Sequence, residues 1–141
     1  MSYLVDINVL SELRRKSPNP TVLQWFKDRP ASTLFLSVLT LGEIRKGIET
    51  ISQVDRRQVL IDWLETDLAA FFTGRILAVD VAVADRWGRL VAGAGRPLPA
   101  IDSLLAAIAL EHDLVLVTRN TKGFESLGVS LINPWNTSQN S

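Results

Sequence analysis

The chain has 141 residues, 47% of them hydrophobic, which is enough to bury the core of one domain and too many for a disordered chain. Fifteen basic and fifteen acidic side chains cancel to zero formal charge, which argues against a protein that coats nucleic acid through bulk electrostatics. The absence of cysteine excludes disulfides, thiolate zinc sites and cysteine nucleophiles, and it fits a reducing compartment.

The first structured segment is predicted to be a short strand that passes directly into a helix. Residues Tyr3–Val5 form an apolar run that ends at Asp6. Apolar side chains at helical spacing then follow between Val9 and Leu13. We expect the strand to end at Asp6 and the helix to begin just beyond Asn8, which is the better candidate for its N-cap.

Asn19 followed by Pro20 is typical of a helix start, because asparagine caps a helix and proline fits its first position. That helix is expected to end near Arg29. The β-branched and aromatic residues of 33–38 then predict a second strand, and a further helix is expected over 40–51.

A long amphipathic helix is predicted from Val54 to Phe72, where apolar side chains recur at helical spacing with charged residues between them. Gly74 is expected to end it. Residues 76–79 predict a third strand that ends at Asp80, and another helix follows as far as Leu90.

Glycine and proline residues mark 93–99 as a loop. A strongly apolar helix is expected over 100–110, followed by a fourth strand over 114–118 and a fifth over 129–132. The polar end of the chain, 136–141, has no periodicity and is expected to be a flexible tail.

Strands that alternate with helices, each strand apolar throughout, indicate an α/β fold in which helices cover both faces of a parallel sheet of about five strands. We find no internal repeat and no linker, so residues 1–135 are expected to form a single domain. Asp6 interrupts the only apolar run near the N-terminus, and the longest run, 104–110, is too short to span a bilayer. We therefore expect a cytoplasmic protein without a membrane partner.

Four polar positions fall where a parallel sheet would gather them, in the crevice outside the carboxyl ends of its strands. These positions are Asp6, Glu43, Asp102 and Asn120. Three carboxylates in one crevice repel and raise one another's pKa unless a cation neutralises them. Oxygen ligands without cysteine or histidine suit Mg²⁺ or Mn²⁺, ions that serve phosphoryl chemistry.

Each acidic position also has a structural interpretation. Asp6 could cap the helix after the first strand, and Glu43 could form a capping box with a threonine three residues before it. Asp102 could cap its own helix, and Asp80 is interpreted as a structural cap. His112, at the end of its helix, is interpreted as a helix-terminal histidine rather than a catalytic base.

Four segments together resemble PIN-domain ribonucleases of the VapC-type toxin family. They are 4–12, 36–44, 99–107 and 117–124, and they occur in the correct order over almost the whole chain. The closing Asn-Pro-Trp at 133–135 is similar to the branch of that family that includes the FitB-like proteins.

The resemblance implies a Rossmann-like, three-layer α/β/α PIN domain, usually a homodimer, with Mg²⁺- or Mn²⁺-dependent endoribonuclease activity on RNA. It also implies that the protein is the toxic half of a type II toxin–antitoxin pair, whose cognate antitoxin covers the active site and binds operator DNA. Carried over residue by residue, Asp6, Glu43 and Asp102 are metal-binding acids. The fourth acidic position of the family falls on Asn120, which can position a water but adds no negative charge.

Basic side chains near these segments are candidate contacts to the RNA backbone: Arg14, Arg15, Lys16, Arg45, Lys46 and Arg119. Two other hypotheses stay open. One is a receiver-like signalling module in which Asp80 accepts a phosphoryl group. The other is a regulator that binds metal, has lost turnover because of Asn120, and acts through its antitoxin on operator DNA. Metal-dependent RNA cleavage by the partner-free protein separates the nuclease from both.

Overall fold

The computed structural model describes residues 1–139, and its centre is a five-stranded sheet in the order β3-β2-β1-β4-β5. All neighbouring strands are parallel. The strands are β1 (Tyr3–Val5), β2 (Leu34–Ser37), β3 (Ile76–Leu77), β4 (Val115–Val117) and β5 (Leu131–Ile132). The predicted parallel sheet of five strands is confirmed, although the strands β2 to β5 are shorter than predicted.

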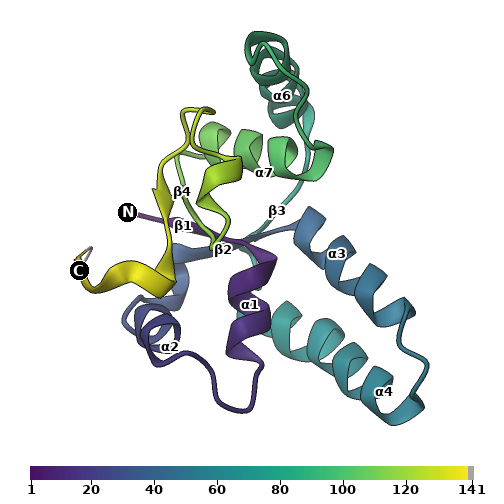
Figure 1. The fold of residues 1–141 in the computed structure, drawn as a ribbon. Coiled ribbons are helices and arrows are strands. Elements are labelled where there is room, and N and C mark those ends of the chain that lie inside the picture. Colours follow the sequence, from purple (N-terminus) through teal and green to yellow (C-terminus); the bar gives the residue numbers. More distant parts are fainter. Residues whose placement is uncertain (140–141) are drawn as a thin grey trace.

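Helices cover both faces of this sheet, which gives the three-layer α/β/α arrangement seen in Figure 1. One face carries α1 (Ile7–Leu13), α2 (Pro20–Lys27), α3 (Val38–Glu49) and α4 (Val54–Asp62). The other face carries α6 (Val81–Gly93) and α7 (Ala100–Glu111). Shorter helical segments are η1 (Ala31–Thr33), η2 (Trp63–Leu68), α5 (Ala69–Phe71), η3 (Thr121–Gly123) and η4 (Pro134–Gln139).

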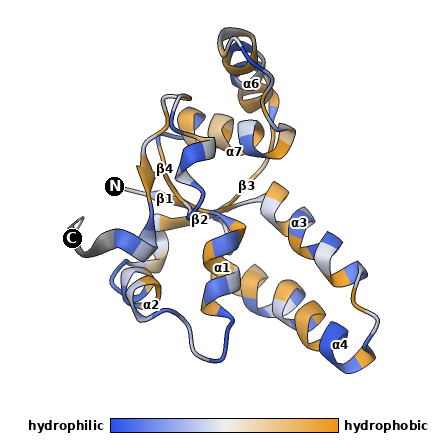
Figure 2. Cartoon of the chain, in the orientation of Figure 1, coloured by the Kyte–Doolittle hydropathy of each residue, from blue (hydrophilic) through white to orange (hydrophobic). Residues whose placement is uncertain are grey.

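The central strand β1 contributes to two cores, one on each side of the sheet. Tyr3 and Val5 pack with the helices α1 to α4, whereas Leu4, between them, packs with α7. This alternation follows from the strand geometry, because successive side chains point to opposite faces. Helix α7 is apolar along most of its length and is buried against the sheet, whereas α4 mixes apolar and polar residues (Figure 2).

The predicted caps of α2 and α6 are confirmed, whereas the start of α1 differs from its prediction. Asn19 caps α2 by accepting hydrogen bonds from the backbone, and Asp80 caps α6 in the same way. Helix α1, however, begins at Ile7, and its N-cap is Asp6. The prediction that Asn8 caps this helix is therefore wrong. His112 lies at the end of α7, as predicted.

The long helix predicted over 54–72 is interrupted by the π-helical segment η2 between α4 and α5. A π-helical turn holds more residues than an α-helical turn, so the apolar stripe changes direction there. Two apolar residues of the predicted helix are exposed, Val59 by 56% and Phe71 by 39%. The chain then turns at Gly74, whose positive φ of 76° glycine adopts readily.

The C-terminal segment η4 packs against α2. The predicted tail, 136–141, begins inside this segment, and residues 140–141 lie outside the described part of the chain. Within residues 1–139, no helix has both the length and the apolar character required to cross a membrane.

Candidate active site

Asp6 lies at the carboxyl end of β1, the middle strand of the sheet, and only 7% of it is exposed. Its Oδ1 accepts a hydrogen bond from the backbone N–H of Ile7 at 2.8 Å. Its Oδ2 accepts one from the Thr118 hydroxyl at 2.8 Å. The carboxylate is therefore held both by the start of α1 and by the end of β4, and the N-terminus of a helix favours its negative charge.

Thr118 is fully buried and joins the ends of β1 and β4. Its hydroxyl donates to Asp6 and accepts from Asn8 Nδ2 and from the backbone N–H of Asn120, each at 3.1 Å. Asn8 Oδ1 in turn accepts from the backbone N–H of Arg119 at 3.1 Å. The side chain of Asn8 thus joins the first turn of α1 to the end of β4, and it does not cap a helix.

The sequence analysis did not identify Thr118 as part of the site. The observation that reveals it is the pairing of β1 with β4, in which Val5 lies opposite Val117. The residue after Val5 is Asp6 and the residue after Val117 is Thr118, so the pairing brings these two side chains together. This pairing joins segments more than a hundred residues apart, so the local sequence pattern does not contain it.

Glu43 is carried by α3, whose N-cap is Ser37. The Ser37 hydroxyl accepts the backbone N–H of Leu39 at 2.9 Å, and Thr40 lies buried within the helix. The predicted capping box between Thr40 and Glu43 is therefore wrong, because the helix starts before it. Glu43 is half-buried and is not used to end or begin the helix.

Asp102 lies in the first turn of α7, which has Pro99 at its N-cap position. The prediction that Asp102 itself caps this helix is wrong. The side chain is half-buried. The N-terminal turn of a helix stabilises a carboxylate, so the fold places Asp102 where its negative charge is tolerated.

The pKa values of these acids show that the fold places them around one site. Burial raises the pKa of Asp6, and the charge of Asp102 raises it further, although the hydrogen bonds from Thr118 and Ile7 lower it. Burial also raises the pKa of Glu43, as do the charges of Asp6 and Asp102, while Lys46 lowers it. Burial raises the pKa of Asp102. The carboxylates therefore repel one another within a partly desolvated space.

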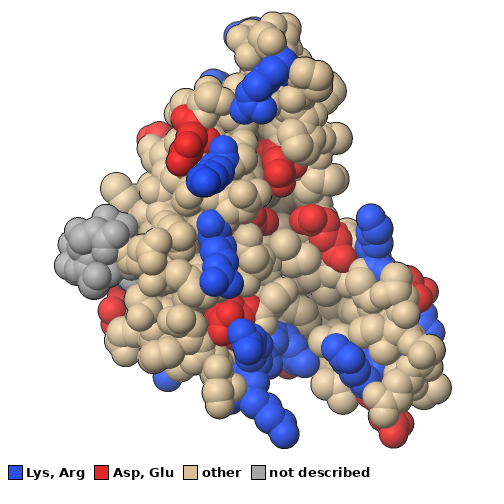
Figure 3. Space-filling model, in the orientation of Figure 1, with Lys and Arg blue, Asp and Glu red and all other residues tan. Residues whose placement is uncertain are grey.

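These acids gather around the recess where α1, α3 and α7 begin, and acidic side chains are visible there in Figure 3. In the part of the chain that the structure describes, none of them forms an ion pair with lysine or arginine. No three acidic, histidine or cysteine side chains among residues 1–139 stand close enough to hold an ion in their present positions. The donor set of these acids consists of oxygen atoms only, which fits Mg²⁺ or Mn²⁺.

Asn120 lies two residues beyond the buried Thr118, at the start of η3, and is exposed. Its backbone N–H is bonded to the Thr118 hydroxyl, which also holds Asp6. Its side-chain amide lies against Gly123, where an added Cβ would stand 3.1 Å from Nδ2. The structure therefore joins the backbone of Asn120 to the acidic site, while its side chain rests on η3.

The candidate RNA contacts fall into different settings. Two are paired with acids: Arg45 with Glu65, and Arg15 with Glu12. Two have a guanidinium carbon 4.8 Å from a ring centroid: Arg14 over Trp63, and Arg119 over Trp135. Lys46 is close enough to Glu43 to lower its pKa. Arg14 and Arg119 are thus held by aromatic rings and form no ion pair with a carboxylate in the described part of the chain.

The family assignment follows from a comparison with known proteins. The family model described as PIN domain matches residues 3–129. The chain belongs to the PIN-domain family. The predicted Rossmann-like α/β/α fold of that family is confirmed by the arrangement of strands and helices described above.

Relatives of this PIN domain match it over nearly its whole length. Plasmid stability protein StbB of Pseudomonas syringae pv. tomato is 37% identical, covering 94% of this chain and 97% of its own. Toxin FitB of Neisseria gonorrhoeae is 34% identical, covering 94% and 97%. VapC ribonuclease Y4jK of Sinorhizobium fredii is 33% identical, covering 94% and 96%. The predicted resemblance to VapC-type PIN-domain toxins of the FitB-like branch is confirmed.

Solved structures give the same result for the fold. The structure of FitAB bound to an IR36 DNA fragment matches this PIN domain with a TM-score of 0.89 and 32% identity, covering 95% of this chain and 96% of that one. The crystal structure of FitAcB from Neisseria gonorrhoeae matches with a TM-score of 0.88 and 33% identity, covering 95% and 99%.

Proposed function

We propose that this PIN domain is a Mg²⁺- or Mn²⁺-dependent endoribonuclease that hydrolyses RNA phosphodiesters. The observation that carries the proposal is that Asp6, Glu43 and Asp102 lie close enough to feel one another's charge, while none of them forms an ion pair among the described residues. Their negative charge is left for a cation to neutralise. A relative that is 33% identical and named VapC ribonuclease supports the same activity.

The three acids would hold the cation. When bound, a divalent ion stabilises the charge that develops on the phosphate and lowers the pKa of a water. Asp6 is fixed from two sides by Ile7 and Thr118, so it sets the position of the site. Glu43 and Asp102 are half-buried and carry no structural hydrogen bond as helix caps, so they are free to turn toward a ligand.

Hydrolysis also needs groups that orient the attacking water and take its proton. Asn120, bonded through its backbone to Thr118, lies at the edge of the site and can orient a water or a phosphate oxygen. Glu43 lies close enough to Asp6 and Asp102 to feel their charges, and it could take the proton of a water if it held the ion through that water and not directly. These are the roles that we assign to residues of this chain.

We further infer that the protein is the toxic member of a toxin–antitoxin pair. Its 34% identity to a protein named toxin FitB, and its match to FitAB bound to DNA, support this role. In this proposal a cognate antitoxin covers the acidic site and carries the DNA contact, and the PIN domain forms a homodimer. The zero formal charge of the chain is consistent with DNA binding through a partner.

The test is RNA cleavage by the purified full chain without a partner. We expect structured RNA to be cleaved in Mg²⁺ or Mn²⁺ and to stay intact in EDTA. Asp102→Asn should abolish the cleavage, whereas the matched control Asp85→Asn, on the exposed surface of α6, should preserve it. Metal binding without cleavage would support the regulator hypothesis instead, and neither binding nor cleavage would contradict the proposal. The receiver hypothesis needs an Asp80 carboxylate that is available to accept a phosphoryl group. The Asp80 carboxylate instead accepts the backbone N–H of Val83 as the cap of α6, next to the edge strand β3.

A further inference from the structure

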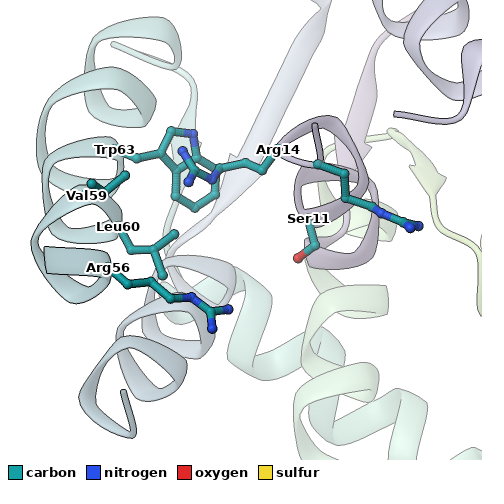
Figure 4. Close-up of a pocket in the computed structure, with 7 residues that line it drawn as sticks. Ser11, Arg14, Arg56, Val59, Leu60 and Trp63 are labelled. Carbon is teal, nitrogen blue, oxygen red and sulfur yellow. The ribbon is translucent and has the colours of Figure 1, made fainter. Parts of the chain in front are cut away.

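A second charged feature lies between α1 and α4, at the opposite end of α1 from Asp6. It is a hollow of about 320 Å³, which we call the basic hollow. Besides two aliphatic side chains of α4, it is lined by Ser11, Arg14, Arg15, Arg56 and Trp63. Figure 4 shows Arg14 reaching from α1 to the Trp63 ring and Arg56 reaching from α4 into the same space.

The charge of the basic hollow is balanced only in part by its surroundings, because Arg15 alone of its three arginines pairs with an acid among residues 1–139, Glu12. No acidic residue lines it. Among residues 1–139, Arg14 and Arg56 form no ion pair. Several arginines elsewhere on the surface do pair with acids: Arg45, Arg57, Arg86 and Arg89. A concave surface with unpaired cations attracts an anionic ligand.

The hollow also has a flat stacking surface. The guanidinium of Arg14 lies 4.8 Å from the centroid of the Trp63 ring. Trp63 is the first residue of the π-helical segment, and segments of this kind occur frequently at functional sites. Indole rings and guanidinium planes are the surfaces on which proteins stack unpaired RNA bases. The hollow therefore combines the two features that bind a nucleotide, positive charge and a planar surface.

Helix α1 connects the basic hollow to the acidic site. Ile7, Ser11 and Arg14 follow one another at spacings of four and three residues, which places them on one face of the helix. Ile7 also lines a separate hollow together with Glu43. At about 1.5 Å per residue, Ser11 lies about 6 Å and Arg14 about 10 Å along the helix from Ile7. That span corresponds to about two or three stacked nucleotides at about 3.4 Å each.

We propose that the basic hollow binds a single-stranded part of the RNA substrate, two or three nucleotides from the bond that is cut. Arg14 and Trp63 stack with a base, while Arg56 and Arg15 contact phosphates. The proposal rests on the proposed ribonuclease function and names where its substrate is held. An acidic peptide would satisfy the arginines but would leave the stacked guanidinium and indole without a planar partner, so the observations favour RNA.

The experiment measures binding rather than cleavage. The full chain is titrated into a fluorescently labelled single-stranded RNA of about 12 nucleotides, a length in the range that single-strand-binding surfaces cover, in EDTA at several salt concentrations. We expect Arg56→Ala to weaken binding by about 5- to 10-fold and to lower the slope of log affinity against log salt by about 0.7, the value for one lost phosphate contact. Arg56 is exposed and unpaired in the described chain, so its removal leaves the fold intact.

The matched control is Arg89→Ala, which removes an exposed arginine of α6 that is paired with Asp85. It should change neither the affinity nor the salt slope. Arg14→Ala gives a second test and should weaken binding at least as much as Arg56→Ala. If both variants bind RNA as the control does, the proposal is overturned. If they bind RNA normally but lose affinity for a polyglutamate peptide, the hollow belongs to a protein partner and the proposal is also overturned.

Failure of the basic hollow as an RNA site can be distinguished from failure of the proposed ribonuclease function. Binding that depends on Arg56, in a protein that does not cleave RNA with Mn²⁺, would support the hollow as an RNA site and contradict the nuclease proposal. Cleavage by the wild type with the same KM and affinity in Arg56→Ala would contradict the hollow alone.

Discussion

The two ends of helix α1 carry opposite charges, Asp6 and Arg14, and neither of these side chains forms an ion pair among residues 1–139. At the N-terminal end Asp6 is buried and held by hydrogen bonds, and at the C-terminal end Arg14 is exposed and held by stacking on Trp63. Each charge has the sign that its end of a helix favours. A buried, fixed carboxylate suits a small ion, whereas exposed arginines around a flat surface suit a flexible polymer.

Both ends of α1 also differ from the rest of the surface in how their charges are paired. Most other charges that are close together form ion pairs, such as Arg86 with Glu111 across α6 and α7. Unpaired charge is most informative at the acidic end, because partly buried carboxylates that repel one another cost stability unless a cation binds there. The following predictions test whether the acidic end of α1 is built for a ligand or for the fold.

The largest effect is expected for Glu43→Gln, which removes a charge from the acidic end without touching the cap of α3. Cleavage of RNA in Mn²⁺ should fall at least about 100-fold, because metal binding weakens. The free energy of unfolding should stay unchanged, since Ser37 caps the helix. Cleavage assays and urea unfolding measure the two effects.

Ser37→Ala is the matched control for the fold. It should lower the free energy of unfolding by about 1 kcal/mol through loss of the N-cap. If Glu43→Gln cleaves RNA as the wild type does, Glu43 does not belong to the metal site.

The next largest effect is expected for Thr118→Val, which removes the hydroxyl that holds Asp6. The variant should lose about 1–3 kcal/mol of stability, because Asn8 and the Asn120 amide lose their acceptor. Mn²⁺ affinity should fall about 10-fold, as measured by calorimetry. Thr118→Ser keeps the hydroxyl and should restore the affinity. Wild-type affinity in the valine variant would mean that α1 alone positions Asp6.

A smaller effect is expected for Asp6→Asn in metal-free buffer. The pKa of Asp6 is raised in the folded state, so ionisation of this group opposes folding at neutral pH. Asparagine caps helices as well as aspartate does, so the variant should be at least as stable as the wild type at about pH 7. A clear loss of stability there would show that the charge of Asp6 serves the fold.

The pH dependence of the free energy of unfolding is a second test of the repulsion between the three carboxylates. The pKa values of Asp6, Glu43 and Asp102 are raised above their ordinary values of 3.8, 4.5 and 3.8, so the folded state binds protons first as the pH falls. The contribution of these groups to the free energy of unfolding should therefore increase as the pH falls from neutral toward their ordinary pKa values, and it should be complete below them. Urea unfolding in EDTA should show the advantage of Asp6→Asn shrinking over this interval. An advantage that stays constant would contradict the repulsion.

The smallest effect is expected for Asn120→Asp, which adds a carboxylate next to the acidic end. Mn²⁺ binding should tighten by a few-fold, because a fourth acidic side chain joins the donor set. Ser52→Asp adds the same charge in the exposed loop between α3 and α4 and should leave the affinity unchanged. If both variants bind Mn²⁺ equally, position 120 lies outside the reach of the ion.

The sheet could be predicted from the sequence because its strands are buried on both faces and are therefore apolar throughout. The residues at which the helices begin were harder to predict. Thr40 and Glu43 have capping-box spacing, yet Ser37 caps α3, because β2 ends there and the helix follows without a loop. Local spacing alone does not distinguish these two starts, since both place a hydroxyl shortly before the same apolar face.

The grouping of the acids was predictable from the rule that ligands bind at the carboxyl ends of parallel strands and from the family resemblance. The residues around them were not. Thr118 meets Asp6 only through the pairing of β1 with β4. The basic hollow joins Arg14 to Trp63, which are separated by 49 positions in the sequence and meet only through packing of α1 against the helix that contains the π-helical turn.

The short strand β1 has a consequence for how the site is controlled. The backbone N–H of Asp6 donates to the carbonyl of Val117 at 3.0 Å, in the middle of the sheet. An amide there exchanges with solvent only when the sheet itself opens, which for a central strand means unfolding of the whole domain. Local melting therefore cannot displace the backbone of Asp6 from the end of the sheet while the domain is folded. Any movement that opens or closes the site has to come from α3 and α7, which carry Glu43 and Asp102.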